Sequence, residues 1–133
     1  MKTLLLGGGG FIGRALVPFL SPHGDLTVAT SQERLNVPQG VRKVCLFADD
    51  YLTLDRQLDF SEFERVIDCS WQGLPDLSEE LNAKNLASKF ALIRSLIDNG
   101  VAEYNGIGSC LEYGSLSGLV DESMTGLDVG NFG

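Results

Sequence analysis

The chain has 133 residues, of which 44% are hydrophobic and 21% are charged. This length suits one soluble globular domain, which can bury about two thirds of the surface of its unfolded chain. The formal net charge of −8 argues against a nucleic-acid partner, because proteins that bind a phosphate backbone usually present a basic face.

Cysteine and histidine usage argues against metals and disulfides. Cys45, Cys69 and Cys110 are widely spaced in apolar or strand-like runs, which predicts buried thiols in a reducing compartment. With one histidine and no Cys-x-x-Cys motif, we expect no structural metal. Glycines cut the N-terminal apolar run short, and no later apolar run is long enough to span a bilayer, so a cytoplasmic protein is expected.

The first twenty residues contain a strand pattern, a glycine turn and the start of a helix. Residues 1–6 are a short apolar run, Gly7 to Gly13 follow directly, and Arg14 lies in the predicted helix. A dinucleotide diphosphate needs this order, because it lies against the N–H groups and the positive dipole end of the new helix. Gly7 can take the sharp turn, Gly10 lets a phosphate approach, and Gly13 lets the helix pack on the strand.

These glycines fit two spacings, Gly8-x-Gly10-x-x-Gly13 and Gly7-x-x-Gly10-x-x-Gly13. The alternative is an ordinary flexible glycine-rich turn. The position of the motif, between an N-terminal strand and a helix, favours a nucleotide site.

A second strand is predicted over residues 26–30, and its end bears on the choice of cofactor. An acid at this point would bind the ribose hydroxyls of NAD and repel the additional phosphate of NADP. Here the position holds Ser31, and Arg34 follows three residues later. The pattern favours NADP slightly over NAD, unless Arg34 is an ordinary surface arginine.

A third strand is predicted over residues 44–47, followed by two acids. Asp49 or Asp50 could accept a hydrogen bond from the adenine amino group. Equally, either acid could cap the next helical segment. Residues 52–64 are polar and moderately helical, which predicts a crossover connection.

The fourth strand and its exit are predicted over residues 66–71. Ser70 and Trp71 would then face the cofactor crevice at the carboxyl end of the strand. The alternative for Trp71 is a loop aromatic that covers the edge of the core.

The clearest helix is predicted over residues 81–99. Its apolar residues recur at helical spacing, which predicts a buried stripe formed by Leu86, Phe90, Ile93 and Ile97. Leu92 and Leu96 would point elsewhere, toward another helix or a partner chain. A fifth, glycine-rich strand is expected within residues 101–108.

Five strands separated by helical stretches predict an α/β fold, a Rossmann-type doubly wound parallel sheet with strand order 3-2-1-4-5. One domain over residues 1–133 is expected. Residues 114–133 would be a loop-like tail leading to a missing C-terminal part.

Three separated motifs occur in one order: Gly7-x-x-Gly10-Phe11-Ile12-Gly13, then Asn85 early in the long helix, then residues 108–114 with Ser109, Tyr113 and Gly114. Over nearly its whole length the chain resembles the N-terminal part of the extended short-chain dehydrogenase/reductases, the NAD(P)-dependent sugar-nucleotide epimerases and dehydratases. The resemblance implies an NADP or NAD cofactor, a nucleotide-sugar substrate and a homodimer among the partners.

The resemblance also assigns residues. It places Phe11 and Ile12 with the glycines at the diphosphate, Ser31 at the adenine ribose, and Asp49 or Asp50 at the adenine. It places Ser70 and Trp71 at the nicotinamide, and Asn85 within the cofactor site. It matches Ser109 to the catalytic serine, whose hydroxyl would bond to the substrate while a tyrosine moves the proton and hydride passes to or from the nicotinamide.

The sequence departs from the family at the catalytic tyrosine. None of Tyr51, Tyr104 and Tyr113 has a lysine four residues later, so a Tyr-x-x-x-Lys motif is absent. The motif would lie beyond Gly133, or Phe132 would occupy the tyrosine position. The leading hypothesis is therefore the cofactor half of an epimerase, dehydratase or reductase, and the alternative is a non-catalytic dinucleotide sensor. Another nucleotide-binding Rossmann domain, such as a methyltransferase, is a weaker third hypothesis.

Overall fold

A computed structural model describes residues 1–46, 54–76 and 78–109, together with the isolated residues Tyr113, Leu119, Asp121 and Ser123. The predictions for Asp49, Asp50 and Phe132, and for most of the tail from residue 114, lie outside the described residues.

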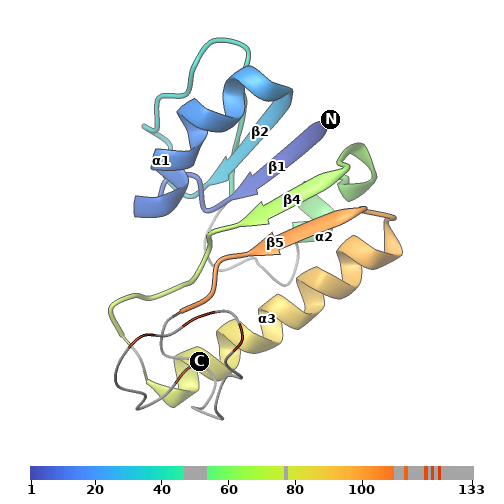
Figure 1. Ribbon diagram of the computed structural model, residues 1–133. Helices are drawn as coiled ribbons and strands as arrows, with labels where there is room; N and C mark the ends of the chain where they lie inside the picture. The colour runs from blue at the N-terminus through green and yellow to red at the C-terminus, as the bar shows by residue number, and fades with distance from the viewer. Residues whose placement is uncertain are drawn as a thin grey trace.

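The described strands form one parallel sheet in the order β3-β2-β1-β4-β5 (Figure 1), so the predicted fold class and strand order are confirmed. The strands are β1 Lys2–Leu6, β2 Asp25–Thr30, β3 Arg42–Cys45, β4 Arg65–Asp68 and β5 Glu103–Gly106. At the centre of the sheet, Leu6 pairs with Ala29 of β2 on one side and with Asp68 of β4 on the other. The three central strands therefore end at the same edge.

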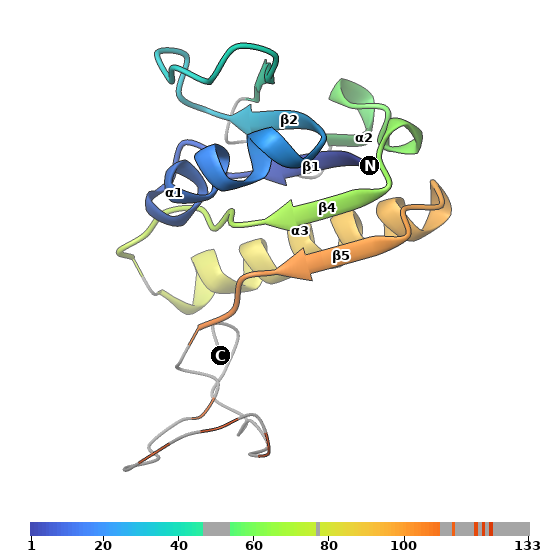
Figure 2. The ribbon, with the colours of Figure 1, turned by 45° about the horizontal axis from the view of Figure 1, so that its top comes forward.

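Helices cover both faces of this sheet (Figure 2). Helix α1 (Phe11–Leu20) lies on one face, and α2 (Leu54–Gln57) and α3 (Glu79–Asp98) lie on the other. Short 3-10 segments follow α1 (Ser21–His23) and precede β4 (Phe60–Glu62). This is the arrangement that a parallel sheet with crossover helices requires, because both faces must be shielded from water.

Side-chain alternation in β1 divides the core into two halves. Leu5 packs with Val17 of α1 and with Val28, whereas Leu4 and Leu6 face the α2 and α3 side. All three leucines are fully buried. Successive residues of a strand point to opposite faces, so a strand covered on both sides appears as a continuous apolar run.

The predicted bounds of the third strand are wrong by two residues. The strand is β3, at the edge of the sheet, and it begins at Arg42 and ends at Cys45. Charged side chains are tolerated at an edge because one side of the strand faces solvent. The apolar pattern therefore missed Arg42 and Lys43, both of which are exposed.

The predicted buried stripe of the long helix is also wrong. Phe90 and Ile97 are 66% and 70% exposed, whereas Leu92 and Leu96 are each 2% exposed and pack in the core. The buried face of α3 consists of Asn82, Asn85, Ser88, Leu92 and Leu96. Its first half is polar because it meets the polar exit of β4, and apolar periodicity does not detect a polar buried face.

In the described parts of the chain, no helix has the length and apolar character needed to cross a membrane.

Leu92→Ala should lower the free energy of unfolding by about 2–5 kcal/mol, because it leaves a cavity in the core. Phe90→Ala, on the exposed face of the same helix, should change it by no more than about 0.5 kcal/mol. Urea unfolding followed by circular dichroism measures both. Equal losses would contradict the burial pattern of α3.

Candidate functional site

A side chain has no room at Gly7, in the turn between β1 and α1, or at Gly13, in the first turn of α1. Gly7 has φ of +74°, and a Cβ there would lie 2.9 Å from the backbone carbonyl carbon of Cys69. A Cβ on Gly13 would overlap the carbonyl oxygen of Gly7. The amide of Gly10 donates to that same oxygen at 2.9 Å, which closes the turn. The helix can therefore start directly beside the ends of β1 and β4.

The N-terminus of α1 has no capping side chain. Gly10 is the N-cap residue, no side chain caps the helix, and no acid lies in its first turn. Phe11 and Ile12 are both exposed. The first N–H groups of a helix have no partner within the helix, and together with the helix dipole they favour an anion.

A cleft of about 270 Å³ lies beside this turn. Its lining residues come from the glycine turn, the end of β2 and the exit of β4: Gly7, Gly9, Gly10, Ala29, Thr30, Ser31, Gln32, Leu46, Cys69, Ser70, Trp71, Gln72 and Gly73. From β1 the chain continues to β2 and β3 on one side of the sheet, and then crosses to β4 and β5 on the other side of β1. The cleft opens between β2 and β4, at the point where this direction reverses. In open α/β sheets, ligands bind at this point.

The structure brings five of the predicted site residues together in this cleft: Gly7, Gly10, Ser31, Ser70 and Trp71. Gly13 is buried in the first turn of α1, and Phe11 and Ile12 lie at the exposed start of the same helix. Arg34, Asn85 and Ser109 are not among the lining residues. All of these assignments to a cofactor or substrate stay predictions.

A lysine orders the loop after β2. Lys43 of β3 donates from Nζ to the carbonyl oxygens of Glu33 and Leu35, at 2.7 and 3.1 Å. This loop carries Arg34, which is exposed. At the start of the loop, the Thr30 hydroxyl oxygen accepts from the amide of Gln32 at 3.0 Å. The loop that follows Ser31 is therefore tied to the neighbouring strand.

At the exit of β4 there is a buried polar network that sequence reasoning missed. Asp68 forms an ion pair with Lys89 of α3, and the two side chains are 1% and 17% exposed. The Asp68 carboxylate also accepts from the amide and the hydroxyl of Ser70 and, at 3.1 Å, from the Tyr104 hydroxyl. Removing one partner of such a buried pair typically costs about 3–5 kcal/mol of stability.

Strand alternation explains how the network assembles. Val66 faces the α3 side of the sheet, so Asp68, two residues later, faces it too. Lys89 lies on α3 four residues after the buried Asn85, hence on the same stripe. Two sequence signals could have indicated the network: an acid that ends a buried strand with Ser70 two residues on, and a lysine in register with buried helix positions.

Two asparagines of α3 hold the segment that follows β4. The side-chain oxygen of Asn85 accepts from the amide of Gln72 at 3.1 Å, and its side-chain nitrogen donates to the Gln72 carbonyl at 2.9 Å. Asn82 accepts from the indole N–H of Trp71 at 3.4 Å. Asn85 thus fixes the backbone of a wall of the cleft.

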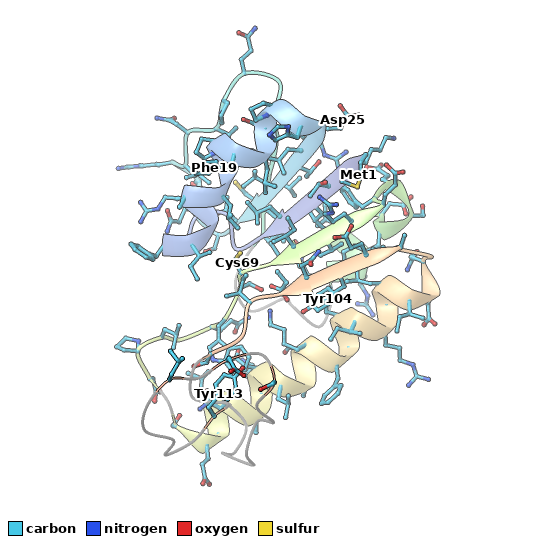
Figure 3. The ribbon with its side chains drawn as sticks, in the orientation of Figure 1. Met1, Phe19, Asp25, Cys69, Tyr104 and Tyr113 are labelled. Carbon is cyan, nitrogen blue, oxygen red and sulfur yellow. The ribbon has the colours of Figure 1, made fainter. Side chains whose placement is uncertain are left out.

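Two titratable groups near the network are held in their neutral form. Burial, together with the charge of Asp68 and the hydrogen bond to it, raises the pKa of Tyr104 well above its ordinary value of 10.0. Burial also raises the pKa of the Cys69 thiol. Figure 3 shows Cys69 at the exit of β4 and Tyr104 on β5. Tyr104 is therefore unsuited to exchange protons near neutral pH.

Among the described residues, no group of three or more His, Cys, Asp and Glu side chains could hold a metal ion.

Because the pKa of Tyr104 is raised, the free energy of unfolding should depend on pH in the alkaline range. The folded state holds this proton more tightly than the unfolded state, so the stability that it contributes is present below about pH 10 and is lost as the pH rises above it. Tyr104→Phe and the parent chain should show equal near-ultraviolet phenolate absorbance at about pH 10. Above that pH, unfolding free energies should fall more steeply for the parent. A larger phenolate signal in the parent at about pH 10 would contradict the assignment.

No protein-family model and no curated protein matches the sequence. Solved structures do match in fold. A UDP-glucose 4-epimerase from Thermotoga maritima, solved with UDP-glucose, has a TM-score of 0.76 and 18% identity, over 99% of this chain and 46% of the epimerase. A mutated uronate dehydrogenase has a TM-score of 0.77 and 13% identity, over 98% of this chain and 48% of the dehydrogenase.

A third match is the Bordetella bronchiseptica enzyme WbmG in complex with NAD and UDP, with a TM-score of 0.76 and 16% identity over 96% of this chain and 44% of that enzyme. This chain spans somewhat less than half the length of the three proteins. At these identities the comparison concerns the fold. The chain therefore has the Rossmann-type fold that its strand pattern predicted, shared with part of each of these three enzymes.

Proposed function

We propose that this chain binds a nicotinamide dinucleotide and forms the cofactor-binding part of an extended short-chain dehydrogenase/reductase that acts on nucleotide sugars. One observation carries the proposal. The uncapped N-terminus of α1 follows a turn without side chains and opens on the cleft at the switch point of the sheet. A diphosphate fits such a turn because the space beside Gly10 is open. A Cβ built there would have only the Gly7 oxygen within 4 Å, at 3.2 Å.

The turn alone cannot supply the affinity. A helix N-terminus stabilises an anion by about 0.3–1 kcal/mol, or about 2 kcal/mol when partly buried, whereas micromolar binding requires about 8 kcal/mol. The walls of the cleft must supply the rest. In the proposed complex, the amides of Phe11 and Ile12 hold the diphosphate, while Ser31 and Gln32 contact the adenosine and Ser70 and Trp71 the nicotinamide riboside. When bound, the dinucleotide would supply hydride chemistry.

The residues after β2 support NADP over NAD. The cleft presents Ser31 and Gln32 there, and neither carries the carboxylate that would repel an additional phosphate. Arg34 lies exposed three residues after Ser31, in the loop that Lys43 orders. In the proposed complex, Arg34 pairs with the additional phosphate of NADP. Arg34→Ala should therefore weaken NADPH binding and leave NADH binding nearly unchanged.

The substrate side of the proposal rests on the resemblance. Ser109 is half-buried three residues beyond β5, and it would bond to a substrate hydroxyl or carbonyl. One matched structure contains UDP-glucose and another contains NAD and UDP. In this proposal the nucleotide sugar is the substrate of the whole enzyme. The 133-residue chain should then bind the dinucleotide without turning over a substrate.

Gly10→Asp separates binding from folding. The residue has φ of −72° and ψ of 175°, which suit an aspartate N-cap, so the helix gains a cap and the thermal midpoint should stay within about 4 °C of the parent. The same carboxylate occupies the free amides and repels a diphosphate. Titration of NADPH and NADH fluorescence should show binding to the parent and at least about tenfold weaker binding to the variant.

Gln39→Glu is the charge-matched control for Gly10→Asp. Gln39 is exposed just before β3, at the amino-terminal edge of the sheet, opposite the cleft. It should bind like the parent. A parent chain that binds neither dinucleotide would refute the proposed function. If Gly10→Asp bound as tightly as the parent, the diphosphate would not lie on this turn.

A further inference from the structure

We infer that the hydroxyl oxygen of Ser70 is a dedicated hydrogen-bond acceptor for the nicotinamide riboside half of the dinucleotide, and that Lys89 and Asp68 set its direction as positioning residues. The inference rests on the proposed function. It adds a chemical requirement: the ligand group at the exit of β4 must be a hydrogen-bond donor.

The hydrogen-bonding positions of the Asp68 carboxylate are all used within the protein. A carboxylate has about four lone-pair positions. Four donors approach this one: the amide and hydroxyl of Ser70 at Oδ1, and Lys89 Nζ and the Tyr104 hydroxyl at Oδ2. The side chain is 1% exposed. Asp68 therefore bonds to groups of the protein and not to a ligand, and it orients those groups.

Asp68 and Lys89 fix the direction of the Ser70 hydroxyl. A hydroxyl has one proton and two lone pairs. The proton goes to Asp68, and one lone pair accepts from Lys89 Nζ at 2.8 Å. Ser70 also lines the cleft, although the residue as a whole is only 8% exposed. The second lone pair of the Ser70 hydroxyl oxygen remains, so toward a ligand this oxygen can only accept a hydrogen bond.

This geometry excludes a serine–lysine nucleophile. In such a pair, the lysine amine would have to accept the serine proton. Here the Lys89 Nζ donates to both Asp68 and Ser70, and the serine proton points to the carboxylate. The two residues orient a bond to a ligand instead of activating an attack.

The position of Ser70 relative to the diphosphate turn indicates which part of the dinucleotide it would contact. The diphosphate turn follows β1, and the cleft extends from it toward the ends of β2 and β4. In Rossmann domains the adenine ribose lies at the end of the second strand. The nicotinamide riboside therefore extends over the exit of β4. Its donors are the carboxamide nitrogen and the ribose hydroxyls.

The test compares ADP, NADH and reduced 3-acetylpyridine adenine dinucleotide, whose acetyl group lacks the amide donor. Calorimetry on the parent and on Ser70→Ala should show ADP binding unchanged and NADH binding about three- to tenfold weaker in the variant. Ser31→Ala is the matched control at the end of β2, and it should weaken ADP and NADH in parallel. A general loss of structure would not change the NADH-to-ADP affinity ratio selectively.

The acetylpyridine analogue distinguishes the two donors. If Ser70 accepts from the carboxamide, the parent should bind the analogue more weakly than NADH, and Ser70→Ala should bind both equally. If Ser70 accepts from a ribose hydroxyl, the parent should bind both equally, and Ser70→Ala should weaken both. Either pattern supports the inference.

Ser70→Cys is the second variant should Ser70→Ala fail to fold, because a thiol still donates weakly to Asp68 but is a poor acceptor. It should lower the NADH-to-ADP affinity ratio in the same direction. An unchanged ratio in these variants would overturn the inference while leaving the proposed function intact. A parent chain that binds neither ADP nor NADH would overturn both.

Discussion

The close contact between the glycine turn and the exit of β4 is the constraint on which the rest of this structure depends. Gly7 passes so near the backbone of Cys69 that a single added carbon would not fit, and Gly13 packs against Gly7 in the same way. This contact brings the start of α1 to the ends of the central strands. The uncapped start of α1 therefore lies beside the cleft at the switch point of the sheet.

Helix α3, on the face of the sheet opposite α1, holds the wall of the cleft at β4. Helix α3 supplies Asn85, which binds the backbone of Gln72, and Lys89, which pairs with Asp68. These contacts explain why the first half of the buried face of α3 is polar while Leu92 and Leu96 complete the core. One helix therefore both covers the sheet and positions the groups that face a ligand.

The parts of the fold that depend on local pattern could be predicted from the sequence. Five strand patterns separated by helical stretches led to the strand order, and the glycine turn after the first of them led to the position of the cleft, because both follow from general rules for parallel sheets. The face of α3 could not be predicted from apolar spacing, since Phe90 and Ile97 are exposed while Asn82 and Asn85 are buried. The network of Asp68, Lys89 and Tyr104 joins three elements distant in sequence, so the local signals at Asp68 and Lys89 do not show that these residues meet.

The two ends of the cleft are anchored very differently. Lys43, an exposed side chain, ties down the loop after β2, whereas a buried ion pair and a bidentate asparagine hold the exit of β4. Exposed contacts of this kind contribute little to the free energy of unfolding. Breaking a buried ion pair, in contrast, removes a substantial part of the free energy of unfolding of a small domain. A substitution that changes the end near Ser31 should therefore cost the fold little, whereas one that changes the geometry at Ser70 should also destabilise the domain.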